Sequence, residues 1–328
     1  MNKQQSKSPM LLYVAGIVFI IWGVLGLMDM KNYVDSGFQS DDNNAIVNIE
    51  PGSPAEAAGM LLGDIIKTSG GIDINNNKEL SKRDRPAAGD VRDYVVDRDG
   101  SDVTIPLTYT GLTDKDKSLN MVAFVIGLLF VLLGIWAHYK HKSALSYGFA
   151  IFSLCFGFIF FAGPHIAPGM LDNLINSIST TVVIFSFAFL LGYMLKYPPE
   201  SKHQKLLYLP AILVAVMIWG LNFIQPDGSG TINMVIRLFF GGVIIFYFLS
   251  SLITLIRKYM RSSKEDRESK GLNMMLVGAV VGLLPILIYF TAGTLSPGID
   301  LPGNDYVFIT FLAIPIFFTM ALNKVSHS

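Results

Sequence analysis

Cysteine and charged residues are both scarce in this 328-residue chain. The single cysteine, Cys155, excludes any disulfide framework within the chain. Only 15% of the residues are charged and 52% are apolar, and the mean hydropathy is +0.48. Soluble domains carry about 25% charged residues, so this composition excludes an ordinary soluble protein. We expect most of the chain to be solvated by lipid.

Motifs for catalysis are also lacking. The sequence contains no HExxH motif, no GxSxG nucleophile elbow, no Walker loop and no His or Cys cluster with metal-ligand spacing. Four of the five histidines fall in predicted cytoplasmic loops or in the tail, where we expect them to be solvated, and the fifth, His165, falls in an outer loop. We therefore expect no enzymatic activity and no cofactor, and nothing in the sequence indicates a nucleic-acid partner.

Long apolar runs dominate what is present. The first, residues 10–28, is long enough to cross a bilayer as a helix. A cleavable signal peptide is the alternative interpretation, but Met28-Asp29-Met30 offers no small-residue cleavage site. Seven more runs follow at residues 119–137, 143–163, 170–195, 205–224, 231–256, 271–292 and 305–323. The sequence thus predicts a polytopic α-helical membrane protein of eight transmembrane helices.

The distribution of Lys and Arg predicts the orientation. Alternate loops carry basic clusters, such as RKYMRSSKEDRESK at 257–270, whereas the loops between them, including GPHIAPG and QPDGSG, carry no Lys or Arg. Positive charge in short loops stays on the cytoplasmic side. We expect both termini on the cytoplasmic side of the membrane and an extracytoplasmic insert. The predicted parts are a tail with the first helix (1–28), the extracytoplasmic domain (29–118, core 33–110), a seven-helix bundle (119–324) and a cytoplasmic tail (325–328).

The insert shows the pattern of a small α+β unit. Residues 45–50 alternate as a strand, Ser53 can cap a short helix with Glu56 completing a capping box, and Gly59 can end that helix. Residues 62–66 begin another strand. An Arg98-Asp99-Gly100 turn then joins two strands of a hairpin. Residues 29–118 also hold 17 acidic against 10 basic side chains, an excess that favours cationic partners or simply solubility.

This order of PGSPA helix, GDII strand and RDG hairpin resembles a bacterial PDZ domain over about residues 33–110. The resemblance implies that an extended peptide adds to a sheet edge while a loop receives its terminal carboxylate. By position, the mouth of that groove falls at Ser36, Gly37 and Phe38, and the opposing helix falls near residues 78–84. The segment KELSKRDRP is charged and is cut by Pro86, so Leu80 is its one sizeable apolar contact. A groove that is shallow or self-occupied is the alternative.

Polar residues at the outer level of the spans form a second candidate site. Charged groups at membrane depth are costly and mark buried or water-filled places. We expect an outer vestibule that contains His165, Asp172, Asn176 and Arg237, with Asp172 as the partner of Arg237; snorkelling of Arg237 to the headgroups is the alternative. Three prolines within the spans, which we expect to favour kinks, are Pro210, Pro285 and Pro315.

The whole pattern is similar to the membrane sensor half of the competence-pheromone histidine kinases. The likeness includes the amino-terminal anchor, the PDZ-like insert, Ala162-Gly163-Pro164 and the final span LAIPIFFTMALNK. It implies location in the plasma membrane of a bacterium, a homodimer, and a cytoplasmic kinase or response-regulator partner. The sequence has no phosphoacceptor histidine box and no nucleotide-binding glycine boxes, so we expect these residues to sense without phosphorylating. Whether Ser328 is the natural end is open.

Three functional classes follow from these observations. The first is a sensor whose extracytoplasmic domain recognises a peptide or protein terminus and signals through the bundle. The second is an accessory membrane protein that tethers an envelope protease or its substrates. The third is a transporter, which is disfavoured because seven spans do not divide into equal halves and no pair of broken apolar segments marks inverted repeats.

Overall fold

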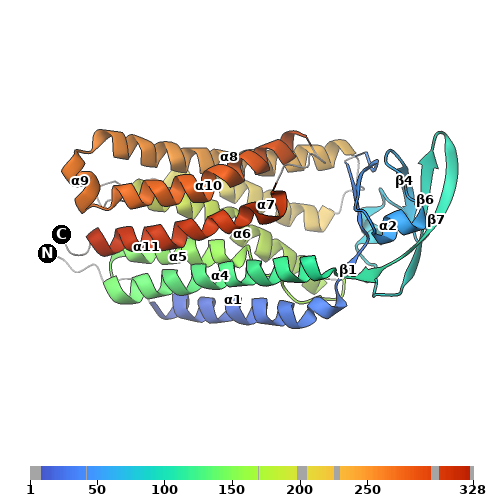
Figure 1. Cartoon of the computed structure of the whole chain (residues 1–328), viewed down its shortest axis with the longest axis horizontal. Coiled ribbons are helices and arrows are strands. Elements are labelled where there is room, and N and C mark those ends of the chain that lie inside the picture. The colour runs from blue at the N-terminus through green and yellow to red at the C-terminus, as the bar shows by residue number, and fades with distance from the viewer. Residues whose placement is uncertain are drawn as a thin grey trace.

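A bundle of helices carries a small domain of strands at one end in the computed structural model (Figure 1). The structure describes residues 9–41, 43–168, 170–197, 205–224, 230–296 and 303–325. We call residues 33–113 the strand domain. The first described helix begins, and the last ends, at the end of the bundle far from the strand domain (Figure 1).

Helices form at all eight predicted apolar runs. Six of the described helical segments are long and apolar enough to cross a membrane, and two shorter apolar helices accompany them. The prediction of a multi-pass helical membrane protein is thus supported. The α-helices outside the strand domain are α1 (Pro9–Asp29), α4 (Asp114–His141), α5 (Ala144–Phe158), α6 (Met170–Lys196), α7 (Leu209–Ile224), α8 (Gly230–Arg261), α9 (Lys264–Ser269), α10 (Leu272–Leu295) and α11 (Ala313–Val325). Short 3₁₀ segments are η1 (Met30–Asn32), η2 (Lys205–Tyr208) and η3 (Asn304–Leu312).

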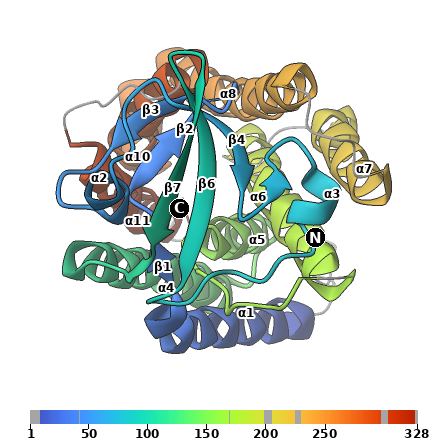
Figure 2. The ribbon, with the colours of Figure 1, turned by 90° about the vertical axis from the view of Figure 1, so that its right-hand side faces the viewer.

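The bundle is centred on α5 and α6, and α1 lies at its periphery beside α4 (Figure 2). Aromatic side chains fill its core, with ring centroids of Phe156 and Phe311 5.0 Å apart. Small residues bring α4 and α5 close together. A Cβ at Gly127 would lie 2.7 Å from the carbonyl oxygen of Gly157, and the Ser153 hydroxyl donates to the Phe130 carbonyl at 2.7 Å. Close backbone approach of this kind stabilises helix pairs in lipid.

The three prolines within the predicted spans occupy two kinds of position. Pro285 lies inside α10, as expected. Pro210 is the second residue of α7 and Pro315 the third of α11, so both lie in a first turn. The 3₁₀ segments η2 and η3 run directly into α7 and α11, so each of these prolines follows the change from 3₁₀ to α-helix within a continuous helical run. The prediction that Pro210 and Pro315 favour kinks within their spans stays a prediction.

The strand domain is built from three small antiparallel sheets. β1 pairs with β8, β2 pairs with β3, and the third sheet has the order β5-β4-β6-β7. Two short helices, α2 (Pro54–Ala58) and α3 (Asn77–Leu80), complete it. The strands are β1 (Val34–Asp35), β2 (Phe38–Ser40), β3 (Ile46–Ile49), β4 (Ile65–Ser69), β5 (Ile72–Asp73), β6 (Val91–Arg98), β7 (Ser101–Thr108) and β8 (Thr110–Gly111).

Local sequence signals account for most of this domain. The Ser53 hydroxyl accepts a hydrogen bond from Glu56 N at the start of α2, and Gly59 ends the helix with φ +83°. The Glu56 carboxylate reaches Gly52 N at 2.5 Å rather than the Ser53 amide that a capping box would use. Asp99 and Gly100 both have positive φ, as a tight hairpin turn between β6 and β7 requires.

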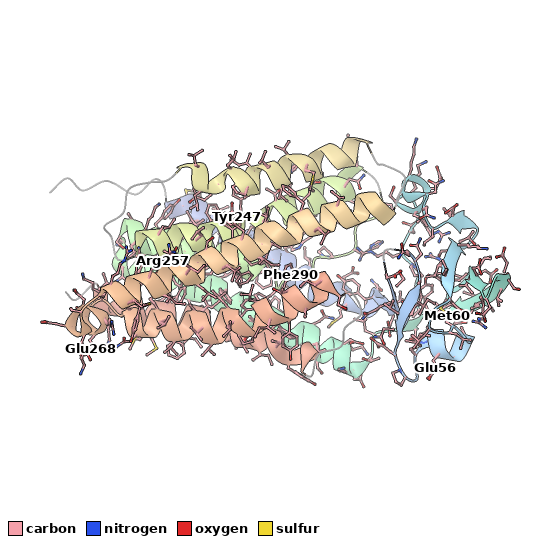
Figure 3. All side chains as sticks on the ribbon, turned by 90° about the horizontal axis from the view of Figure 1, so that it is seen from above. Glu56, Met60, Tyr247, Arg257, Glu268 and Phe290 are labelled. Carbon is pink, nitrogen blue, oxygen red and sulfur yellow. The ribbon has the colours of Figure 1, made fainter. Side chains whose placement is uncertain are left out.

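Basic side chains gather at the end of the bundle opposite the strand domain. Figure 3 shows Arg257 and Glu268 near this end, and Glu56 and Met60 in the strand domain. The ammonium group of Lys258 donates to the carbonyls of Met194, Leu195 and Tyr197 at 3.0, 2.7 and 2.6 Å. It thus satisfies carbonyl groups at the C-terminal end of α6, where a helix dipole favours a cation.

Candidate functional site

An open strand edge lies where the sequence predicts the mouth of a peptide groove. In the described residues β2 has β3 as its one neighbour. Phe38 stands opposite Ile49, and the carbonyl of Gly37 accepts from Glu50 N at 2.9 Å. This register makes Phe38 and Ile49 a non-hydrogen-bonded pair, in which each residue's own N–H and C=O point away from the partner strand. The backbone of Phe38 therefore faces the open edge.

Ser36 and Gly37 are engaged by the domain itself. The Ser36 carbonyl accepts from Ala55 N at 3.0 Å, and the Gly37 carbonyl also accepts from the Ser53 hydroxyl at 3.2 Å. Gly37 N donates to the Asp35 carboxylate at 2.8 Å. The Asp35 carboxylate thus occupies the Gly37 amide, which the sequence predicts to lie at the site of the terminal carboxylate of a peptide.

The side chain of Phe38 belongs to the hydrophobic core of the strand domain. Its ring meets Tyr94 edge-on, with centroids 5.7 Å apart and planes at 87°. Tyr94 and Tyr109 share a hydrogen bond of 2.6 Å between their buried hydroxyls. Burial, followed by this hydrogen bond, raises the pKa of Tyr109, so its phenol is neutral at physiological pH. Phe38 contributes its backbone to the open edge and its ring to folding.

The helix expected over residues 78–84 is shorter than predicted. α3 ends at Leu80, which is half-buried and lies outside the hydrophobic core formed by the described residues of the domain. Arg83 turns back to donate to the carbonyls of Ser69 and Gly70, and burial lowers its pKa. The chain then runs without regular structure to Pro86, since a residue before proline is disfavoured in a helix.

One two-stranded stem joins the strand domain to the bundle. β1 follows α1 and η1, β8 precedes α4, and the two strands pair with Val34 opposite Gly111 and Asp35 opposite Thr110. α1 and α4 also pack against each other. Both covalent connections of the domain are therefore held in one ribbon above two adjacent helices.

The loop after α5 braces this stem from the bundle side. The Tyr33 hydroxyl donates to the Gly163 carbonyl, and His165 N donates to the Asp29 carboxylate at 2.6 Å. Burial, and then the negative charge of Asp29, raises the pKa of Tyr33, which stays a hydrogen-bond donor at neutral pH. The segment 161–168 is thereby fixed to the end of α1 and to the first residue of the strand domain.

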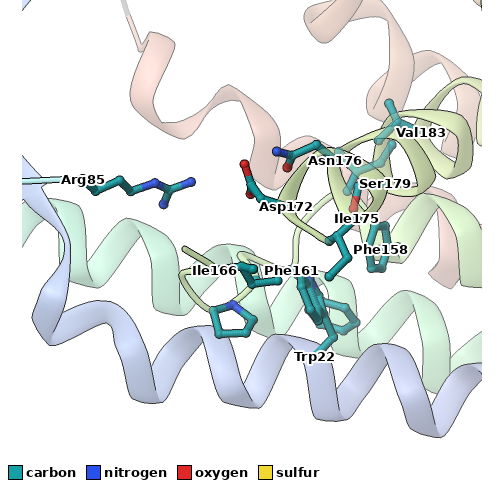
Figure 4. Close-up of a pocket in the computed structure, with 13 residues that line it drawn as sticks. Trp22, Arg85, Phe158, Phe161, Ile166, Asp172, Ile175, Asn176, Ser179 and Val183 are labelled. Carbon is teal, nitrogen blue, oxygen red and sulfur yellow. The ribbon is translucent and has the colours of Figure 1, made fainter. Parts of the chain in front are cut away.

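A cavity of about 230 Å³ lies beside this loop, between the strand domain and the bundle (Figure 4). Arg85 reaches toward it from the strand domain, and Asp172, Asn176 and Ser179 face it from α6. The guanidinium of Arg85 points toward the carboxylate of Asp172 in Figure 4. Apolar residues complete the wall: Trp22, Phe158, Ile159, Phe161, Ile166, Ile175 and Val183.

A second, larger cavity of about 690 Å³ lies next to the stem. It is lined by His165 together with Tyr33, Asn120 and Arg85, so Arg85 borders both cavities. Within the described part of the chain, the buried Nδ1 of His165 has no hydrogen-bond partner. Three of the four residues predicted for the vestibule, His165, Asp172 and Asn176, thus lie along these two neighbouring cavities.

Arg237, the fourth, belongs to α8, but its side chain lies outside what the structure describes, as does its predicted pairing with Asp172. Among the side chains that the structure describes, Arg85 is the cation that points toward Asp172 (Figure 4). The sequence analysis missed Arg85 because it counted KELSKRDRP as the charged wall of a peptide groove. The following Pro86, which ends the helical pattern, is the signal that could have placed this arginine in a projecting loop.

Comparison with models of protein families, with curated proteins and with solved structures gives no match. Among the described residues no group of three or more His, Cys, Asp or Glu side chains could hold a metal ion. The site is therefore characterised by its own geometry, with an open strand edge and a charged cavity at the junction with the bundle.

Proposed function

We propose that this chain is a bacterial membrane sensor with eight transmembrane helices and a PDZ-like domain outside the cytoplasm. The domain recognises a peptide or protein terminus, and the bundle passes the change to a cytoplasmic kinase or response regulator, with the protein acting as a homodimer. The polypeptide described here has no catalytic role in this proposal. Both termini face the cytoplasm, in keeping with the basic end of the bundle.

The stem is the observation that carries the proposal. The paired strands β1 and β8 hold the ends of α1 and α4 together beneath the strand domain. A ligand that prefers one position of the domain would bias both helices at once, because neither connection can move without the other. A ligand shifts such an equilibrium only by its difference in affinity for the two states.

The open edge of β2 supports peptide recognition by strand addition. The outward-facing N–H and C=O groups of Phe38 can each form a hydrogen bond with an added strand. Gln39 and Ser40 beside it are exposed. A terminal carboxylate has to displace Asp35 from Gly37 N. The Asp35 carboxylate thus competes with the carboxylate of the ligand for Gly37 N. We therefore expect a ligand that makes further contacts.

The full chain in lipid nanodiscs should be screened against a library of peptides with free carboxyl termini. We expect binding that weakens when the same peptides are amidated, and that strengthens in Asp35→Ala because Gly37 N is released. Asp41→Ala is the matched control, since Asp41 makes similar contacts to Asn43 N and Ala45 N away from the β2 mouth. No binding by wild type or by Asp35→Ala across the library would refute peptide capture.

A further inference from the structure

We infer that the 230 Å³ cavity at the junction is a second binding site, and that its ligand is a free apolar α-amino acid bound as a zwitterion. The inference stands on the cavity alone and not on the strand edge of β2. It adds a small-molecule signal to the peptide signal proposed above, at a different place in the fold.

Opposite charges at the rim indicate a ligand that carries both signs. Arg85 projects from the strand domain and Asp172 from the first turn of α6, and they point toward each other (Figure 4). No ion pair or hydrogen bond engages either side chain within the described parts of the chain. A guanidinium binds a carboxylate through two parallel hydrogen bonds, while Asp172 and the amide oxygen of Asn176 can accept from an ammonium group.

The remaining wall indicates an apolar side group. Trp22, Phe158 and Phe161 contribute aromatic surface, and Ile166, Ile175 and Val183 contribute aliphatic surface. Burial of an apolar side chain here is favourable by about 25 cal/mol per Å² removed from water. A purely polar zwitterion would leave this wall uncovered, so the structure favours amino acids with large apolar side chains.

Size decides between an amino acid and larger amphiphiles. Drug-sized ligands occupy pockets of about 300–1,000 Å³, and this cavity is smaller. A phospholipid can present the same two charges, but its acyl chains need far more apolar surface than these residues supply. A single amino acid has the required charges and fits the volume.

The position of the site gives the ligand a mechanical consequence. Its carboxylate would be held by the strand domain through Arg85 and its ammonium by α6 through Asp172. A bound amino acid would therefore bridge the strand domain and α6, which are otherwise joined through the stem and the loop contacts. We expect occupancy to restrict movement of the strand domain relative to α6.

Blocked amino acids test the charge assignments directly. The full chain in nanodiscs is titrated with free apolar L-amino acids, L-phenylalanine and L-leucine first, and with the amide and N-acetyl forms of those that bind. We expect each blocked form to bind about tenfold to a hundredfold more weakly, because each loses one charge-assisted contact. Equal binding of free and blocked forms, or no binding of any apolar amino acid, would overturn the inference.

Two variants then assign each charge to its residue. In Arg85→Gln the free acid and its amide should bind equally, and in Asp172→Asn the free amine and its N-acetyl form should bind equally. Lys78→Gln, which removes an exposed cation from α3, should keep the wild-type preferences. Val183→Trp should fill the cavity and abolish binding of every form. If both charge variants keep the wild-type preferences, the site lies elsewhere.

Two further results separate this site from its alternatives. Displacement of the amino acid by phosphatidylethanolamine, with stronger binding of the lipid, would identify a headgroup site and overturn the inference. Failure of the peptide screen described above leaves the amino-acid result unchanged, since Arg85 and Asp172 take no part in the β2 edge. The two proposals can thus fail separately.

Discussion

The Arg98 guanidinium donates to both carboxylate oxygens of Asp64, at 2.8 and 2.6 Å. Asp64 is buried and also accepts from Leu61 N at 2.9 Å, while Arg98 reaches the Gly59 carbonyl at 2.9 Å. This bidentate pair ties the β6–β7 hairpin to the segment between α2 and β4. It is the best-buried ion pair among those of the described residues, so it should matter more than the exposed pairs around it.

Removing one partner of this pair should weaken the strand domain. We expect Arg98→Met to lower the local free energy of unfolding, because the little-exposed carboxylate of Asp64 is left without its charged partner. Hydrogen exchange of the β6 and β7 amides in the full chain measures this. Lys67→Met is the control, since Lys67 pairs with Asp97 and Asp102 at the surface and its loss should lower the free energy of unfolding much less. Equal losses in the two variants would contradict the assignment.

The same pair predicts sensitivity to acid. Hydrogen bonds from Arg98 lower the pKa of Asp64 below its ordinary value of 3.8. The folded state thus has the lower pKa, so the stabilisation is complete above about pH 4 and is lost as the pH falls through the folded pKa. Pepsin should cleave the wild-type strand domain progressively faster as the pH falls below about 4. Asp64→Asn should be cleaved faster throughout and show a weaker pH dependence, after correction for the pH profile of pepsin on an unfolded substrate.

Gly37 should tolerate no side chain. Its φ is +74°, and a Cβ there would overlap Ser53 at the start of α2. We expect Gly37→Ala to destabilise the β2–α2 junction by more than the roughly 1–2 kcal/mol that positive φ alone costs. Gly52→Ala isolates that cost, because Gly52 has φ +76° and no atom near its Cβ position. Hydrogen exchange at β3 compares the two variants, and similar protection in both would show that Ser53 yields without cost.

Lys258 should stabilise the far end of α6. We expect Lys258→Met to lower the thermal stability of the full chain and to speed exchange of the last amides of α6, since carbonyls at that end lose a charged donor. The loss should be about 2 kcal/mol, typical of one hydrogen-bonded charge. Arg261→Met removes an exposed cation from the end of α8, the helix that carries Lys258, and should change thermal stability and exchange little. Unchanged exchange in Lys258→Met would show that these carbonyls find other partners.

Labelling of intact cells tests the proposed orientation. In a Cys155→Ala background, Ser101→Cys places a thiol on the exposed β6–β7 turn and Lys264→Cys places one on exposed α9. A membrane-impermeant maleimide should modify position 101 in intact cells and position 264 after permeabilisation. The reverse pattern would invert the topology, and modification of both in intact cells would show that the two ends of the bundle do not lie on opposite sides.

Much of the fold could be predicted because its signals are local. The run 10–28 is apolar without interruption. Ser53 caps the start of α2 and Gly59 ends it through neighbouring atoms, and Asp99-Gly100 turns a hairpin by its own φ angles. Such features depend on residues a few positions apart. The helices at all eight apolar runs and the β6–β7 hairpin therefore follow from the sequence alone.

The tertiary structure decided which charges meet. Arg85 and Asp172 are 87 positions apart, and no periodicity links a loop of the strand domain to the first turn of α6. The sequence predicted the level of Asp172 in the bundle but not Arg85 as a residue that points toward it, because hydropathy indicates depth along a helix and not which neighbour faces it. The hydrogen bond from Gly37 N to the Asp35 carboxylate likewise depends on backbone angles that bring the donor and the acceptor close to each other. The local sequence determined the helices and strands, and tertiary packing determined which side chains meet.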